Sequence, residues 1–383
     1  PDKNGLIIFS LFLFSLITTA LFAQPDGISV AKSGNSYIVN FSLQQYDFSS
    51  ITNEGKDYVE INIPGYGTEA VVGMPALPQI SFNLFIPNVQ QIPSVIVNSV
   101  DKSVEKLNQK VYPKQMYWSR DRSLSDKPFA INSDYYNSVG IEKPLVSFSE
   151  TFVVGGVSGV MITINPFAYN PKENKLTITN SASFEVKHSS AVESTTLKSD
   201  VFNEFLENIL VGYQPLRSLK SMRYLIITAP TFEAGLSSFI THKSSQSFTV
   251  DVFNTTTTGT TTTAIKAFIQ ARYDNEATRP EFILLVGDVQ HIPSWIGTGE
   301  GTPNTDLNYA QLAGADKFAD AFIGRFSVTT ATELQNALTK SIYMESHIAT
   351  FAKKNIFMAS TDNYAITEGT HNYVIDTHFQ PAG

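Results

Sequence analysis

The sequence predicts a β-rich region followed by an α/β region with a mostly parallel, doubly wound sheet. From about Ser29 to His188, short runs of alternating polar and apolar residues are broken by Gly, Pro and Asn, as in antiparallel strands. From Tyr224 onward, continuous apolar runs alternate with amphipathic helices, as in βαβ units. Hydrophobic residues make up 42% of the 383 residues and charged residues 16%, so the chain can bury ordinary cores.

The first 23 residues have the pattern of a secretory signal peptide. An apolar run over residues 6–16 follows Lys3, and it suits a signal better than a membrane-spanning helix because it is short. The alternative is an N-terminal membrane anchor. Cleavage after Ala23 leaves Gln24 as the new terminus. We expect a secreted or cell-surface protein with no stable membrane insertion after signal removal.

Residues 24–213 form the predicted β-rich domain. Residues 58–63 and 176–179 show its period-two alternation. A helix is expected to close the domain, because apolar residues recur there at spacings of three and four. These are Phe202, Phe205, Leu206, Ile209 and Leu210.

Residues 214–223 are predicted to be a linker, because they lack a strong hydrophobic period. Arg217, Lys220 and Arg223 make this stretch basic, and an exposed basic linker is an easy site for proteolysis. These three residues are therefore candidate processing sites. The alternative is a linker that is merely soluble. Arg223 abuts the next strand and should be the least accessible of the three.

Residues 224–383 form the predicted α/β region, in which strands and helices alternate. The expected strands cover residues 224–228, 248–253, 282–286, 321–323 and 355–360. The expected helices have apolar faces at Phe232, Leu236, Phe239 and Ile240, at Ile265, Phe268, Ile269 and Tyr273, and at Leu334, Leu338 and Ile342. The threonine-rich run 255–263 is read as a loop, with Thr263 capping the next helix. Thr330 and Glu333 form a predicted capping box.

Two acidic residues lie just past predicted strands of this sheet. Gly287-Asp288 comes after the strand 282–286, and Asp362 comes after the strand 355–360. Ligands of open α/β sheets bind outside the carboxyl ends of the strands. Asp288 and Asp362 are therefore the polar residues on which a site would be built, although an aspartate at such a position also caps turns.

Composition and motifs exclude several classes of function. The formal net charge of −8 does not favour nucleic-acid binding, which needs a basic face. The chain has no cysteine, so disulfides do not stabilise it and no thiol nucleophile is present. Gly-x-Ser-x-Gly, His-Glu-x-x-His and Gly-x-x-x-x-Gly-Lys patterns are all missing. His371 and His378, without a third ligand, make a poor metal site.

Several segments of the α/β region, taken in order, resemble the catalytic domain of gingipains, the C25 family of cysteine peptidases. The β-rich region resembles the propeptide of that family, most clearly at residues 73–78 (Gly-Met-Pro-Ala-Leu-Pro). Together these likenesses cover nearly all of the chain after the signal. The matching pieces of the catalytic domain are residues 224–228, 285–293, 305–310, 323–327, 362–364 and 366–369.

This resemblance implies a propeptide followed by a truncated caspase-like α/β domain, and a cysteine-type endopeptidase. A thiolate attacks the peptide carbonyl, a histidine acts as base, and an acid orients the histidine. Asp362 stands at the position of that acid, with turn capping as the alternative. The family's histidine and cysteine come later in its sequence, so we expect them beyond Gly383 and expect residues 1–383 alone to be inactive.

Further expectations follow from the resemblance. Glu368 stands near the acid of the specificity pocket, although an exposed helix-start glutamate is the simpler interpretation. No cofactor is certain; members of the family bind calcium, with Asp316 and Asp320 as conceivable ligands here and solvated loop carboxylates as the alternative. The expected substrates are proteins or peptides. The propeptide is expected to pack on its own peptidase domain and block its site.

Two rival functions stay open. A non-catalytic secreted adhesin or binding protein related to gingipains would lack the later cysteine. An unrelated doubly wound hydrolase would need its own nucleophile within these residues, and no serine has a convincing setting.

Overall fold

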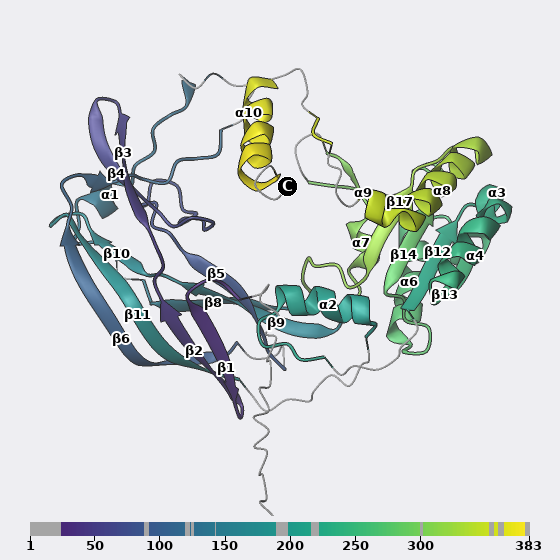
Figure 1. Ribbon diagram of the computed structural model, residues 1–383, viewed down its shortest axis with the longest axis horizontal. Coiled ribbons are helices and arrows are strands. Elements are labelled where there is room, and N and C mark those ends of the chain that lie inside the picture. Colours follow the sequence, from purple (N-terminus) through teal and green to yellow (C-terminus); the bar gives the residue numbers. More distant parts are fainter. Residues whose placement is uncertain are drawn as a thin grey trace, which may run out of the picture.

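A computed structural model shows a β-rich region and an α/β region joined through helix α2 (Asp200–Ile209) (Figure 1). The predicted signal peptide, residues 1–23, lies outside the described residues. The structure describes residues 24–87, 92–118, 123, 126–141, 143–188, 198–215, 222–298, 302–351, 356–358 and 364–379.

Strands dominate the first region, as the alternation predicted. Its described strands form a five-stranded sheet in the order β1-β2-β11-β10, with β6 also on β11, and the three-stranded sheets β5-β9-β8 and β3-β4-β7. The pairing is antiparallel, except that the short β7 runs parallel to β4. The strands are β1 (Ile28–Ser33), β2 (Ser36–Ser42), β3 (Asp47–Asn53), β4 (Lys56–Asn62), β5 (Ile80–Phe85), β6 (Ser94–Lys106), β7 (Lys110–Val111), β8 (Val146–Val154), β9 (Val157–Ile164), β10 (Phe167–Asn170) and β11 (Lys175–Lys187).

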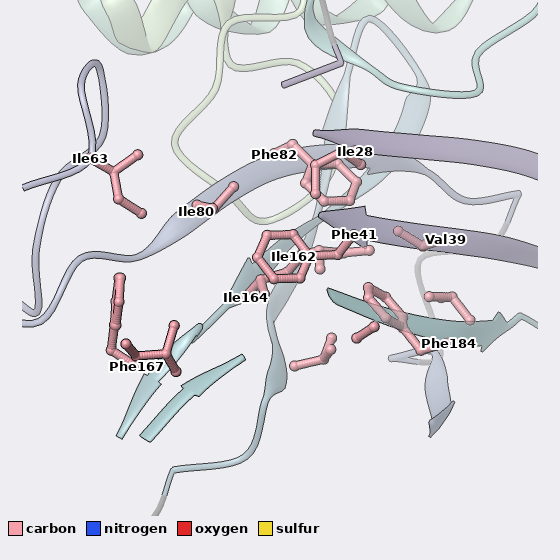
Figure 2. Close-up of a cluster of buried hydrophobic side chains, with 14 of the residues drawn as sticks. Ile28, Val39, Phe41, Ile63, Ile80, Phe82, Ile162, Ile164, Phe167 and Phe184 are labelled. Carbon is pink, nitrogen blue, oxygen red and sulfur yellow. The ribbon is translucent and has the colours of Figure 1, made fainter. Parts of the chain in front are cut away.

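One hydrophobic core lies between these sheets. Apolar residues from β2, β5, β9 and β11 converge in it, as Figure 2 shows for Phe41, Phe82, Ile162 and Phe184. β11 organises the region, because β6 pairs along one of its edges and β10 and β2 pair along the other. The alternating pattern of the sequence is therefore the signature of strands that bury one face.

A four-stranded parallel sheet forms the centre of the second region, in the order β13-β12-β14-β17. Helices pack on both of its faces. Helix α6 (Thr262–Asp274) covers the face that carries Leu225, Ile227, Ile283 and Leu285. Helices α4 (Ser237–Ser245) and α8 (Ala331–Ser346) cover the opposite face. The strands are β12 (Met222–Thr228), β13 (Phe248–Asn254), β14 (Phe282–Val286) and β17 (Phe322–Phe326).

Helix α8 begins where the sequence predicts. Thr330 accepts from the backbone N–H of Glu333, and the Glu333 side chain accepts in return from the backbone N–H of Thr330. The helical pattern from Phe232 to Ile240 is confirmed, but it divides into α3 (Pro230–Glu233), the 3₁₀ turn η2 (Ala234–Leu236) and α4.

The predicted threonine-rich loop 255–263 is wrong in part. Thr255–Thr258 form a helical turn, α5, because the Asn254 side chain accepts from the backbone N–H of Thr256. Gly259, at a φ of 84°, ends that turn. Thr261, and not Thr263, caps α6, since its Oγ1 accepts from the backbone N–H of Ala264 at 3.1 Å.

Strand ends also differ from the prediction. β17 continues through Gly324 and Arg325 to Phe326, because all five of its residues pair with β14. β12 begins at Met222, so Arg223 lies inside a strand. Of the strand expected at 355–360, the described residues 356–358 have no regular structure.

The remaining elements are α1 (Ser133–Tyr136), β15 (Trp295–Ile296), β16 (Asn304–Thr305), α7 (Leu307–Ala310), α9 (Ile348–Phe351), α10 (Tyr364–Val374) and the π-helical turn η3 (Ile375–Phe379).

Candidate functional site at the carboxyl edge of the parallel sheet

The strand order places Asp288 at the topological switch point of the sheet. The chain passes from β12 outward to β13 and then returns to the other side of β12 to form β14, so the order reverses between β12 and β14. Ligands of doubly wound sheets bind at this point, outside the carboxyl ends of the strands. Gly287 and Asp288 follow β14 there, and their backbone N–H groups donate to the carbonyls of Phe326 and Val328, both at 3.0 Å.

Gly287 lets the chain turn tightly after β14. Its φ is 132°, and a Cβ atom at this position would lie 2.8 Å from the Cβ of His291. A larger residue would therefore force the segment 288–291 away from the sheet. The glycine is thus required by the turn that presents Asp288.

The carboxylate of Asp288 is held in its ionised form. The Ser327 hydroxyl donates to its Oδ1 at 2.7 Å, and this hydrogen bond, aided by the backbone N–H of Val289, lowers the pKa of Asp288 below its usual value. Hydrogen bonds to the charged form favour it. The edge of the sheet therefore carries a fixed negative charge.

Arg325 ties together three of the segments that suggested the gingipain family. Its Nε and Nη2 donate to the two carboxylate oxygens of Asp306 at 2.8 and 2.7 Å. Its Nη1 donates to the carbonyls of Gly287 and Ile292 at 2.7 and 2.8 Å. Only 10% of the Arg325 side chain is exposed, so this bidentate pair is well shielded. Arg325 is therefore a support for the loop that carries Asp288.

His291 faces the start of the helix that follows β12. Its ring lies 5.1 Å from the ring of Phe232 in an edge-to-face arrangement. Its Nδ1 is buried and, among the described residues, has no hydrogen-bond partner. Burying a polar atom without a hydrogen-bond partner costs free energy, so the Nδ1 of His291 stands out among the polar atoms of this edge.

Arg325, Ser327, Asp306 and His291 lie within the segments 285–293, 305–310 and 323–327 that resemble the family, but the sequence alone assigns no role to them. The sequence already pointed to this part of the chain, since the three segments that contain these residues occur in the same order as in the family. Which of them touch each other depended on the parallel register of β14 and β17, and no pattern within one segment reveals that register.

The predicted site residues are only partly placed by the structure. Asp362, Arg217 and Lys220 lie outside the described residues. Glu368 lies exposed in α10. Arg223 lies in β12, where its Nη1 pairs with Oδ2 of Asp251 at 2.9 Å. A residue that is both within a parallel strand and ion-paired is a poor site for proteolysis.

The two conceivable calcium ligands both accept backbone hydrogen bonds. Both oxygens of Asp320 are occupied, Oδ1 by the N–H of Gly155 and Oδ2 by the N–H groups of Leu312 and Ala313. Asp316 accepts from the N–H of Val153 at 2.7 Å. Within the described part of the chain, no group of three or more His, Cys, Asp or Glu side chains is arranged to hold a metal ion.

The carboxyl edge supplies an ionised carboxylate, a hydroxyl and a rigid arginine support. It does not supply a thiol, because the 383 residues contain no cysteine. This set can orient and accept hydrogen bonds, but it does not make up a nucleophile with its base.

Comparison with protein families identifies both regions. The family model of the C25 propeptide matches residues 18–221, and the model described as peptidase family C25 matches residues 217–381. The two matches meet at residues 217–221, inside the predicted linker.

Curated relatives resemble the chain along most of its length. Lys-gingipain HG66 from Porphyromonas gingivalis is 28% identical over 407 residues, which cover 96% of this chain and 23% of that protein. Gingipain R2 from the same organism is 25% identical over 91% of this chain and 50% of its own length. The chain thus spans about a quarter to a half of these relatives.

Solved structures of the same group resemble the chain over less than half of its length. A complex of the pro- and mature domains of RgpB from Porphyromonas gingivalis is 18% identical, with a TM-score of 0.43, and covers 49% of this chain and 99% of that one. A structure concerned with the zymogenic latency of gingipain K is 25% identical, with a TM-score of 0.39, over 43% of this chain and 93% of that one. Among the described residues, no helix is both long and apolar enough to cross a membrane.

Proposed function

Because the chain belongs to peptidase family C25 and carries the propeptide of that family, we propose that it is the front portion of a secreted cysteine-type endopeptidase proenzyme. The observation that carries this proposal is the order of the two family matches, propeptide first and peptidase second, over residues 18–381. The full protein would hydrolyse peptide bonds in proteins. Export would follow from the signal-like residues 1–23.

The catalytic chemistry would come from residues that follow the described sheet. A thiolate would attack the peptide carbonyl, and a histidine would take up and return the proton. Asp362 is the proposed acid that orients this histidine and stabilises its charged form. The cysteine and the histidine are proposed to lie beyond Gly383, in a domain of caspase-like fold, so residues 1–383 alone would be inactive.

The β-rich region would act as the propeptide that keeps the enzyme latent. Cleavage in the basic linker would separate the two, and Arg217 and Lys220 are better candidates than Arg223, which lies in β12 and pairs with Asp251. Glu368, exposed on α10, is proposed as a contributor to substrate preference for basic residues. Structural calcium is part of this proposal, with Asp316 and Asp320 as conceivable ligands, and the oxygens of Asp320 also accept backbone N–H groups.

Determining the coding sequence beyond Gly383 and assaying the extended protein tests this proposal. We expect an open frame with a His-Gly segment and a later cysteine. The processed protein should hydrolyse a protein substrate, lose activity on thiol alkylation, and lose it again when that cysteine is replaced by alanine. In the extended protein, Asp362→Asn should lower kcat by about a hundredfold or more, because the histidine loses its orienting acid.

A frame without the cysteine, or hydrolysis that survives alkylation, would overturn the enzyme assignment. The first of these outcomes would favour the non-catalytic alternative, a secreted adhesin or binding protein of the same family. The control variant is Glu368→Gln, which should alter the preference for the residue before the cut and leave alkylation sensitivity unchanged.

A further inference from the structure

A lysine and a glutamate of the β-rich region meet in a small cavity. Nζ of Lys143 contacts Oε2 of Glu69, although the two residues are far apart in the sequence. The cavity has a volume of about 110 Å³, and both side chains line it. Its other walls are mostly apolar and come from Met74, Pro75, Tyr135, Ile141, Phe167 and Ala168. Only 11% of the Glu69 side chain is exposed, so water reaches this carboxylate from few directions.

Two backbone N–H groups hold the other oxygen of the glutamate. Oε1 of Glu69 accepts from the N–H of Ala70 at 2.9 Å and from that of Val71 at 3.2 Å. The N–H of Glu69 itself donates to the carbonyl of Leu77 at 2.9 Å, which fixes the main chain at this residue. Two N–H donors on one oxygen stabilise negative charge that develops on a carbonyl oxygen. The carboxyl group is therefore polarised, with Oε2 facing the lysine.

The main chain beside Lys143 is tied to the same frame. Nδ2 of Asn165 donates to the carbonyl of Pro144 at 2.9 Å, and Oδ1 of Asn165 accepts from Nε2 of Gln79 at 2.8 Å. The segment that contains Gln79 pairs in turn with residues 67–69, which include the glutamate. One asparagine thus fixes both segments, so the lysine and the glutamate need little further ordering to meet.

The amine of Lys143 enters the cavity from the surface, because 45% of its side chain is exposed. Burial of its charged end lowers the pKa of Lys143 below the usual value, since an environment with less water disfavours the ammonium. A larger share of the side chain is then the neutral amine, which is the nucleophilic form. The exposed side of the lysine also gives a released water molecule a way out.

We propose that Lys143 and Glu69 condense to form an amide cross-link between their side chains. Nζ attacks Cδ of Glu69, and the N–H groups of Ala70 and Val71 hold the negative charge that develops on Oε1. The Cδ–Oε2 bond then breaks. Two of the three protons of the ammonium leave with Oε2 as one water molecule, and the third stays as the amide N–H. The atoms balance without a co-reactant.

Positioning decides whether this condensation proceeds in water. For separate molecules the free amine and carboxylate are favoured, but groups held in contact react as if at effective concentrations of about 10⁵–10⁸ M. A surface ion pair lacks this advantage. Nζ of Lys175 and Oε2 of Glu173 lie 2.8 Å apart with 48% and 52% of their side chains exposed, where side-chain freedom and water favour the separate ions. This pair is an internal control that should stay uncondensed.

The cross-link supplies a covalent closure that the composition of the chain otherwise leaves out. The chain has no cysteine, so no disulfide can close a loop in it. A side-chain amide restricts the unfolded chain as a disulfide does, and thiols do not break it. It joins the segment before β5 to the segment before β8, and both of these strands pair with β9. The sheet β5-β9-β8 is thereby locked around its central strand.

Intact-mass spectrometry of the denatured chain tests the proposal. We expect the wild-type protein to be lighter than its sequence by one water molecule. After digestion, the peptide that contains Glu69 should be found joined to the peptide that contains Lys143. Lys143→Arg keeps the positive charge but presents no amine, so this variant should have the full mass of its sequence. On a denaturing gel the two proteins should migrate differently, because only the wild-type chain is closed into a loop.

Further variants assign the roles of the neighbouring residues. Glu69→Ala should also have the full mass, whereas Lys175→Arg, in the surface pair, should still lose one water. Asn165→Ala keeps both reacting side chains but removes the frame, and should slow the appearance of the cross-link after synthesis by about tenfold or more. Circular dichroism checks that each variant is folded.

A wild-type protein that keeps its full mass after prolonged incubation at neutral pH would refute the cross-link, as would a loss of water that maps to other residues. The decisive measurement is made on the wild-type chain, so a variant that fails to fold does not leave the question open. It needs no peptidase activity, and its outcome is therefore independent of the proposed function.

Discussion

The two regions of this protein build their cores in different ways. In the β-rich region, strands distant in the sequence meet around one continuous core, as when β2 pairs with β11 and β5 with β9. In the α/β region, the sheet separates two smaller cores, each closed by helices that connect or follow its strands in the sequence. Local sequence therefore decides most of the second region, whereas long-range pairing decides the first.

The largest effect should come from removing a ring from the β-rich core. Phe184 on β11 is fully buried, so Phe184→Ala should lower the free energy of unfolding of that region by about 3–5 kcal/mol. Hydrogen exchange read by mass spectrometry should show faster exchange in β2, β6 and β11. Leu285→Ala on β14 is the matched change in the other region. Equal loss of protection in both regions from either variant would show that the two cores unfold as one.

Removal of the arginine support should have the next largest effect. Arg325→Met leaves the carboxylate of Asp306 and two carbonyls without their donor, and should lower the stability of the α/β region by about 3 kcal/mol. Thermal unfolding measures the loss, and Arg325→Lys should recover only part of it because lysine cannot form the bidentate pair. A lysine variant as stable as wild type would show that only the charge matters.

A smaller, pH-dependent effect should arise where α4 meets α8. Burial alone would raise the pKa of Glu345, but hydrogen bonds from Lys243 and His242, at 2.7 and 2.8 Å, bring that pKa below its usual value of 4.5. The contact should therefore stabilise the fold above about pH 4.5 and be lost as the pH falls through the lowered value.

Glu345→Gln removes this contribution. The variant should be less stable than wild type by about 1 kcal/mol at neutral pH, and the two proteins should become equally stable in acid. Melting temperatures of both proteins, measured from about pH 3 to 7 so that the range brackets the reference pKa of glutamate, test this expectation. Burial raises the pKa of Asp320, which acts in the opposite direction but is common to both proteins. A constant difference across the range would contradict the assignment.

The smallest effect should come from the cap of α8. Thr330→Ala removes the side-chain half of the capping box and should cost about 1 kcal/mol of helix stability. Thr332→Ala, at an exposed position inside the same helix, is the control and should be near neutral. Amide exchange in the first turn of α8 distinguishes the two variants.

Much of the α/β region was predictable from local patterns. The apolar run 282–286 coincides with β14, and the Thr330–Glu333 capping box begins α8 as expected. The errors occurred where side-chain bonds compete with propensity, as at Asn254, which turned a predicted loop into α5. The sequence predicted where the candidate site lies but not its contacts. Asp288 follows one strand, whereas its hydrogen-bond partner Ser327 follows another strand.

The sequence by itself determined the order of the two regions, the class of each, and the family, because alternation, apolar runs and motif order are properties of the chain. The tertiary structure decided which strands pair, that Arg325 joins three motifs, and that the propeptide hairpin meets Asp316 and Asp320. The physical reason is distance along the chain. Gly155 and Asp320 are 165 residues apart, and a hydrogen bond between a glycine N–H and a buried carboxylate leaves no periodic trace in the sequence.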